Sequence, residues 1–325
     1  MEIFAEFISR AIMQGTPLLL GATGEIITEK SGNLNLGIPG IMYIGAISGV
    51  IGAFFYENSN IFVPALGVFV ALLSCLIGSL LASLIYCFLT ITLRANQNVT
   101  GLALTTFGVG FGNFFGSSLI KVTKSSVPYI SLDGTGDAFS ASLPFAEDLG
   151  WFGTLFFSYG FMVYIAIAIA VLASFFLNRT RAGLHLRAVG ENPATADAAG
   201  INVAKYKYFA TCIGGMIAGL GGLYFIMDYM GGIWSNNGFG DRGWLAIAIV
   251  IFAIWRPLLA IPASYLFGAL YILFNYLNLP MNMIPILQML PYVVTIAALI
   301  FTSIRKKREN QPPASLGLSY FREER

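Results

Sequence analysis

Charge is scarce in this sequence. Only 10% of its 325 residues are Asp, Glu, Lys or Arg, whereas a typical soluble domain has about 25%. Hydrophobic residues make up 57%, and many of the few charges gather at the C-terminal end, so the remainder is more apolar still. This balance excludes a disordered chain, a soluble enzyme and a nucleic-acid binder. It indicates an all-α, polytopic membrane protein.

Groups that carry catalysis or hold metals are also few. The single histidine, His185, has no second histidine or cysteine near it in the sequence, and Cys75, Cys87 and Cys212 lie in apolar stretches at no metal-ligand spacing. The chain has no G-x-x-x-x-G-K-[ST] phosphate loop, no H-E-x-x-H pair and no G-x-S-x-G turn. We therefore expect no metal site, no bound cofactor and no enzymatic activity in this chain.

The apolar runs are continuous, which excludes an outer-membrane barrel with its alternating segments. Because a span needs about 20 apolar residues, we expect about eight to ten transmembrane helices. The run 61–93 is long enough to tilt or to break near Gly78. The run 244–255 is too short to cross alone, and Pro257 should end it at Arg256. The candidate spans cover residues 8–24, 34–56, 61–93, 98–120, 152–178, 207–228, 244–255, 258–276 and 282–304.

Two long loops indicate the orientation. The loop 179–206 carries an excess of Lys and Arg, whereas the loop 121–150 has a mildly acidic balance. The positive-inside rule places 179–206 and the basic cluster at 305–308 in the cytoplasm and 121–150 outside. Counting spans backwards then puts the N-terminus outside. We expect one transmembrane domain over 1–304 and a charged cytoplasmic tail over 305–325.

Two segments interrupt the apolar pattern with glycine and proline. Segment 24–40 places three charges and two asparagines between apolar runs, and segment 238–248 is punctuated by glycines before a short apolar run. Irregular backbone at membrane depth occurs where it lines a cavity or is buried in protein, and paired interruptions point to a transport site. Tight turns, helix caps and interhelical hydrogen bonds are the alternative interpretation. The candidate pathway residues are Asn33, Asn35, Pro39, Asn98, Asn113 and Gly240.

A short helix is predicted over 193–199, inside the basic loop. Asn192 suits the N-cap, Pro193 the first helical position and Gly200 the stop. Its side chains are mainly alanine, which builds no core but lets another surface approach closely. This helix is therefore suited to being pushed by a partner. The alternative is a loop helix that rests on the membrane surface.

Four motifs together resemble the inner-membrane permeases of ABC importers, in the branch of simple-sugar, branched-chain amino-acid and nucleoside permeases. They are GEIITEKSGNLNLG from Gly24, GLHLRAVGENP from Gly183, AGI from Ala199 and GDRGWLAIA from Gly240. The match covers most of 15–275. The opening motif looks most like the nucleoside subgroup, which depends on a BmpA-type lipoprotein and takes guanosine and other purine nucleosides.

This resemblance implies the type II ABC importer permease fold in a bacterial plasma (inner) membrane. It implies a separate ATPase subunit that uses the ATP, a second permease subunit forming a heterodimer, and an extracytoplasmic substrate-binding lipoprotein. The loop 179–206 is then the coupling loop that the ATPase receives. The implied ATPase-coupling residues are Glu191, Asn192, Pro193, Ala196, Ala199 and Gly200.

The expected solute is a nucleoside, with a simple sugar or a branched-chain amino acid as the alternative. An ion-coupled secondary transporter is a further alternative, but it would need an ionisable residue inside the membrane. Asp228, at the end of the run 207–228, is the nearest candidate. A membrane-embedded lipid transferase would need paired acidic or histidine residues, which the runs lack.

Overall fold

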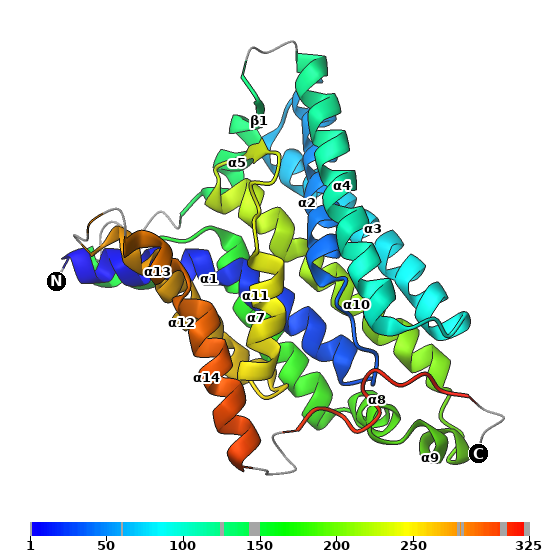
Figure 1. The fold of residues 1–325 in the computed structure, drawn as a ribbon. Coiled ribbons are helices and arrows are strands. Elements are labelled where there is room, and N and C mark those ends of the chain that lie inside the picture. Colours follow the sequence, from blue (N-terminus) through cyan, green and yellow to red (C-terminus); the bar gives the residue numbers. More distant parts are fainter. Residues whose placement is uncertain are drawn as a thin grey trace.

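The computed structural model describes residues 2–59, 61–123, 127–142, 150–277, 280, 283–305 and 311–321, and most of them are helical. Figure 1 shows the long helices inclined to one another around a common centre. The long helices are α1 (Glu2–Glu29), α2 (Ile38–Glu57), α3 (Pro64–Cys87), α4 (Gln97–Thr123), α7 (Phe161–Arg179), α10 (Val203–Tyr224), α12 (Pro257–Ile272) and α14 (Leu290–Arg305).

Shorter elements connect these helices. A π-helical turn, η1 (Phe88–Thr92), extends α3, and a second, η3 (Phe225–Tyr229), extends α10. Two strands, β1 (Tyr129–Ser131) and β2 (Ile233–Ser235), pair antiparallel with Ile130 opposite Trp234. The remaining short elements are α5 (Asp133–Ser140), α6 (Gly150–Phe156), α8 (Arg181–Glu191), α9 (Pro193–Ala198), α11 (Arg242–Phe252), the 3-10 turn η4 (Leu273–Asn275) and α13 (Ile284–Gln288).

The all-α, multi-pass architecture predicted from the sequence is confirmed. Among the described residues, five helices are long and apolar enough to cross a membrane: Ile38–Glu57, Pro64–Thr92, Phe161–Arg179, Val203–Tyr229 and Pro257–Asn275. With 28 and 27 residues, α1 and α4 also exceed the roughly 30 Å hydrocarbon core at about 1.5 Å per residue. The remaining predicted runs correspond to two shorter apolar helices, Arg242–Phe252 and Ile284–Ile300.

Two predicted helix boundaries are wrong. No break occurs at Gly78, because this glycine packs α3 against α2: a Cβ there would lie 2.1 Å from Ser48 Oγ. The run 152–178 is not one helix, since α6 ends at Phe156 and α7 begins only at Phe161. The chain turns at Gly160, where a Cβ would lie 2.3 Å from the Phe139 carbonyl oxygen.

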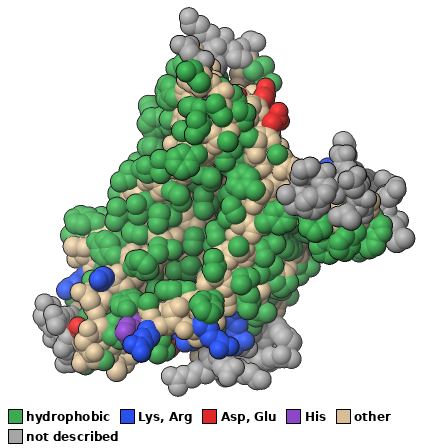
Figure 2. Space-filling model, turned by 180° about the vertical axis from the view of Figure 1, so that it is seen from behind, with side chains coloured by type: hydrophobic (Ala, Val, Ile, Leu, Met, Phe, Trp, Pro, Cys, Tyr) green, Lys and Arg blue, Asp and Glu red, His purple; other side chains and the backbone are tan. Residues whose placement is uncertain are grey.

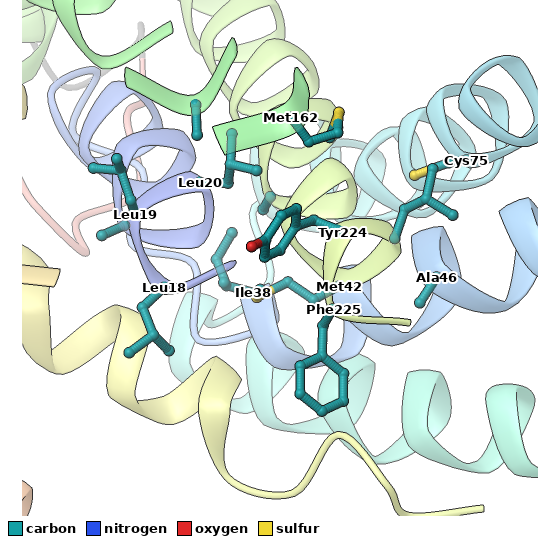
Figure 3. Close-up of a cluster of buried hydrophobic side chains, with 14 of the residues drawn as sticks. Leu18, Leu19, Leu20, Ile38, Met42, Ala46, Cys75, Met162, Tyr224 and Phe225 are labelled. Carbon is teal, nitrogen blue, oxygen red and sulfur yellow. The ribbon is translucent and has the colours of Figure 1, made fainter. Parts of the chain in front are cut away.

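The core lies where α1, α2 and α10 meet. Figure 3 shows Leu18 to Leu20 of α1 near Ile38 and Met42 of α2 and Tyr224 of α10, all without exposed surface. Glycines bring the helix backbones together: a Cβ on Gly24 would lie 2.2 Å from the Gly214 carbonyl oxygen. The close contact of α1 with α10 therefore requires these small residues.

The two predicted loop regions lie at opposite ends of the molecule. Figure 1 shows α8, α9 and the segment 311–321 together at the lower end, called the base from here on, and β1 and α5 near the upper end. In Figure 2 the Lys, Arg and single His side chains gather at the base, below a largely hydrophobic surface. The predicted basic cluster at 305–308 lies mostly outside the described residues.

Candidate functional site

The predicted helix at 193–199 is confirmed as α9, which ends one residue earlier, at Ala198. Its N-cap is Asn192, whose Oδ1 accepts a hydrogen bond of 3.0 Å from the Thr195 amide. Its C-terminus has the Schellman pattern, with Gly200 at φ +82° and Ile201 donating its amide to the Ala196 carbonyl at 3.0 Å. Local hydrogen bonds at both ends therefore fix this short helix.

The predicted coupling residues lie on two faces of α9. Ala196 is 3% exposed and packs with Val189 of α8 and Val203 of α10 inside the subunit. Pro193 is half-buried. An exposed face remains on α9 and its flanks, here called the coupling face after the predicted contact, and its residues are Glu191, Asn192, Thr195, Ala198, Ala199 and Gly200.

The flanking helices hold α9 firmly. Thr180 caps α8 by accepting from the Gly183 amide at 3.0 Å, and Asn202 caps α10 by accepting from the Lys205 amide at 2.9 Å. His185 Nδ1 lies 2.9 Å from the Tyr206 hydroxyl, which joins α8 to α10. A displacement of α9 would therefore be passed to both α7 and α10.

Residues 311–321, part of the predicted C-terminal tail, contact the same region, and the sequence did not predict this contact. Residues 311–321 cross the base of the molecule (Figure 1). The Ser315 amide donates to the Gly190 carbonyl oxygen at 3.0 Å, and the Tyr320 hydroxyl donates to Asp197 on α9 at 2.9 Å. Residues 311–321 are uncharged, include two prolines and show no helical or strand periodicity, so only the structure reveals this docking.

Asn33 and Asn35 lie buried in the turn after α1. Asn33 Nδ2 donates to Thr211 Oγ1 of α10 at 3.0 Å, and the Asn35 amide donates to Glu25 at 3.1 Å. One side-chain atom of each remains without a hydrogen-bond partner, Asn33 Oδ1 and Asn35 Nδ2. Such atoms are the kind of group that a polar solute could satisfy.

Two buried carboxyl groups accompany these asparagines. Glu25 and Glu29 are 0% and 3% exposed, and the Trp255 indole nitrogen donates to Glu29. They belong to the charges of segment 24–40 but were not predicted as pathway residues. Their i, i+4 spacing on one face of an apolar helix was the available signal.

Asn113 of α4 pairs with Asn237, in the loop that also holds Gly240. Asn113 Nδ2 donates to Asn237 Oδ1 at 2.8 Å, and Asn113 Oδ1 accepts from the Asn237 amide at 3.1 Å. Gly240, in the same loop, has φ +58°. Asn98 is exposed on the first turn of α4, apart from this group.

The two interrupted segments meet at a buried junction, formed by Pro39 and Tyr43 of α2 with Phe239, Arg242 and Gly243. A Cβ on Gly243 would lie 2.5 Å from Pro39 Cα. The Tyr43 and Phe239 rings are 5.5 Å apart in an edge-to-face arrangement. The structure thus joins the two segments that the sequence paired, with Pro39 at the first turn of α2.

Arg242 is the charged group of this junction, and the sequence did not single it out. It is 8% exposed, its guanidinium carbon lies 4.1 Å from the Phe225 ring centroid and 4.9 Å from that of Tyr271, and its Nη1 donates to the Phe239 carbonyl at 2.9 Å. Asp228 is also buried, and neither carboxylate oxygen has a hydrogen-bond partner. Both residues stand at the border of apolar runs, where the sequence alone suggests solvent.

The chain is similar to permease components of ABC transporters. A family model described as "Branched-chain amino acid transport system / permease component" matches residues 7–301. The chain is 33% identical to the "Putative glucose ABC transporter permease protein TsgC13" of Haloferax volcanii, over 99% of both chains. It is 32% identical to the guanosine ABC transporter permease protein NupQ of Bacillus subtilis, over 92% of both chains. It is also 32% identical to the nucleoside ABC transporter permease protein NupC of Lactococcus lactis subsp. cremoris, over 90% of both.

Proposed function

The chain belongs to the permease-component family of branched-chain amino acid transport systems. From its similarity to NupQ and NupC, we propose that it carries nucleosides into the cell. It is a multi-pass ABC transporter permease and not an enzyme. In this proposal, ATP is bound and hydrolysed only by the partner ATPase. A substrate-binding lipoprotein delivers the solute from the opposite side of the membrane.

Similarity to NupQ and NupC is the observation that carries the nucleoside proposal. The buried polar groups fit a hydrogen-bonding solute, because Asn33 Oδ1 is an open acceptor and Asn35 Nδ2 an open donor. A nucleobase and its ribose present both kinds of partner. The opening motif of segment 24–40 points to the same subgroup.

A sugar is the second candidate. The similarity to TsgC13, whose name refers to glucose, extends over 99% of both chains. A hexose would use the same buried amides, since its hydroxyl groups both donate and accept. The uptake experiment below distinguishes the two solutes.

We assign the base of the molecule to the cytoplasm and α9 to contact with the ATPase. When the ATPase pair closes, it presses on the exposed face of α9. Because Ala196 anchors α9 to α8 and α10, the motion passes into α10, which packs against α1, α2 and α3. The junction at Pro39 and Gly243 then lies between moving elements. A second, different permease subunit completes the pathway.

Reconstituted uptake tests the proposed solute. The transporter would be placed in proteoliposomes with its ATPase, second permease and cognate lipoprotein, and given labelled guanosine, glucose or leucine. ATP-dependent uptake of guanosine, inhibited by unlabelled adenosine, is the expected result. Uptake of glucose or leucine without guanosine would refute the nucleoside proposal. Uptake driven by an ion gradient without the ATPase would refute the ABC mechanism itself.

A further inference from the structure

A cavity of about 380 Å³ opens at the base, between η1, the start of α10 and the C-terminal segment. It lies beside α9, and Gly200 of the exposed coupling face also lines it. Three of its lining residues carry charge, and two belong to the C-terminal segment. The lining residues used here are Arg94, Asp197, Ala204, Lys207, Ser319 and Tyr320.

Lys207 is the unusual member of this lining. It is 3% exposed, and no carboxylate among the described residues forms an ion pair with it. Asp197 lines the same cavity, but its carboxylate accepts the Tyr320 hydroxyl at 2.9 Å. A buried cation without an opposing charge is costly, and an anion in the cavity would remove that cost.

Further donors surround the same space. Arg94 supplies a second cation, and its guanidinium lies 4.6 Å from the Phe321 ring centroid, within the docked C-terminal segment. The first turn of α10, at Val203 and Ala204, also lines the cavity. Amides in the first turn of a 22-residue helix attract anions. Two cations, a helix N-terminus and one carboxylate thus line the cavity.

We propose that this cavity binds a phosphate group. Either a free phosphate or the headgroup of an anionic phospholipid would supply the same chemistry. The bound group would contact Lys207 of α10 and Arg94 after η1 while the hydroxyls of Ser319 and Tyr320 cover it. Because Tyr320 also holds Asp197 of α9, occupancy would fasten the C-terminal segment to the coupling region. The phosphate proposal does not depend on which solute is transported, although Asn33 also lines the cavity.

The test uses the purified transporter with all its partner subunits, in nanodiscs of neutral phosphatidylcholine. Equilibrium binding of radiolabelled inorganic phosphate is measured for the wild type and for Lys207→Gln and Arg94→Gln. The matched control is Lys205→Gln, which removes an exposed lysine two residues away on the same helix. Lys207→Arg keeps the positive charge. A second arm uses phosphatidylglycerol nanodiscs and native mass spectrometry to identify retained lipid.

Free phosphate is supported as the ligand if the wild type binds phosphate saturably. Lys207→Gln and Arg94→Gln should then each weaken this binding at least tenfold, and Lys205→Gln should change it less than twofold. Phosphatidylglycerol retained by the wild type and the Lys205 variant, but lost from the Lys207 and Arg94 variants, would support the lipid headgroup. If Lys207→Gln fails to fold, the proposal is tested by the other two variants: Arg94→Gln should weaken binding, and Lys207→Arg should retain it. The proposal would be overturned if neither phosphate nor lipid bound, or if none of these substitutions altered the binding.

Discussion

The coupling face of α9 and the buried junction at Pro39 and Gly243 are built in different ways. Hydrogen bonds between near neighbours in sequence define α9, and one face of it is exposed. The junction is held by backbone and ring contacts between segments about two hundred residues apart. One region is specified locally and left free for a partner, whereas the other is specified only by the whole fold.

This difference predicts different responses to mutation. A change on the exposed face of α9 should leave folding intact and alter function, because few internal contacts are lost. A change at the junction should first alter stability, because its atoms are packed on all sides. The following substitutions test this contrast, with the largest expected loss of stability first.

Arg242→Ala should cause the largest loss. The guanidinium stacks on Phe225 and Tyr271 and bonds to the Phe239 carbonyl, and a desolvated cation–π contact with a charged hydrogen bond contributes about 3 kcal/mol or more. Denaturant titration of the purified protein measures the change. Arg181→Ala, at an exposed position on α8, should change the free energy of unfolding by less than about 0.5 kcal/mol. Equal effects of the two substitutions would contradict a structural role for Arg242.

Gly243→Ala should destabilise the protein by about 1–3 kcal/mol, because its methyl group would overlap Pro39 and overpack the junction. Gly110→Ala is the matched control, since it is also helical and a Cβ there meets no atom within 4 Å. Both changes replace a helical glycine with alanine, which favours the helix and cannot itself account for a loss of stability. Thermal unfolding of both variants is the measurement. A Gly243→Ala variant as stable as Gly110→Ala would show that the segments do not touch.

Gly200→Val tests the end of α9. A β-branched residue at φ +82° costs about 1–2 kcal/mol, and the strain is local to the Schellman turn. We expect a modest decrease in thermal stability with a larger loss of uptake at matched expression. Gly200→Asn should retain more uptake, because asparagine tolerates the left-handed region. If Val and Asn behave alike, the left-handed turn does not matter for coupling.

Tyr320→Phe should have the smallest effect, about 0.5–1.5 kcal/mol, because it removes one hydrogen bond to Asp197 and keeps the ring. Hydrogen exchange of residues 311–321 measures it directly. Faster exchange confined to this segment and to α9 is the expected pattern. Unchanged exchange would mean that the hydroxyl does not hold the C-terminal segment on α9.

Local signals explain what the sequence predicted well. The caps at Asn192 and Gly200 define α9 without reference to any other element. The break before Pro257 is equally local, because Arg256 takes the extended conformation that a following proline favours. In both places the residue types alone restrict the backbone.

Contacts distant in sequence explain the rest. Gly78 looked like a break, but it lets α2 approach α3. The pairing of β1 with β2 joins segments about a hundred residues apart, and three-residue strands carry no periodic signal. The pathway prediction stays a prediction: the structure groups Asn33 with Asn35, and Asn113 with the Gly240 loop.

The central claim is that the ATPase contacts the exposed face of α9. The substitution Ala198→Arg tests this claim most directly. Ala198 is exposed, so the arginine should block docking without disturbing the core, whereas Ala196→Arg would disrupt the buried contact with Val189 and Val203. Ser140→Arg, at an exposed position at the opposite end, is the control. At equal membrane levels, Ala198→Arg should lose ATPase co-purification and ATP-driven guanosine uptake, and Ser140→Arg should keep the ATPase. An Ala198→Arg transporter that keeps both its ATPase and its uptake would contradict the assignment.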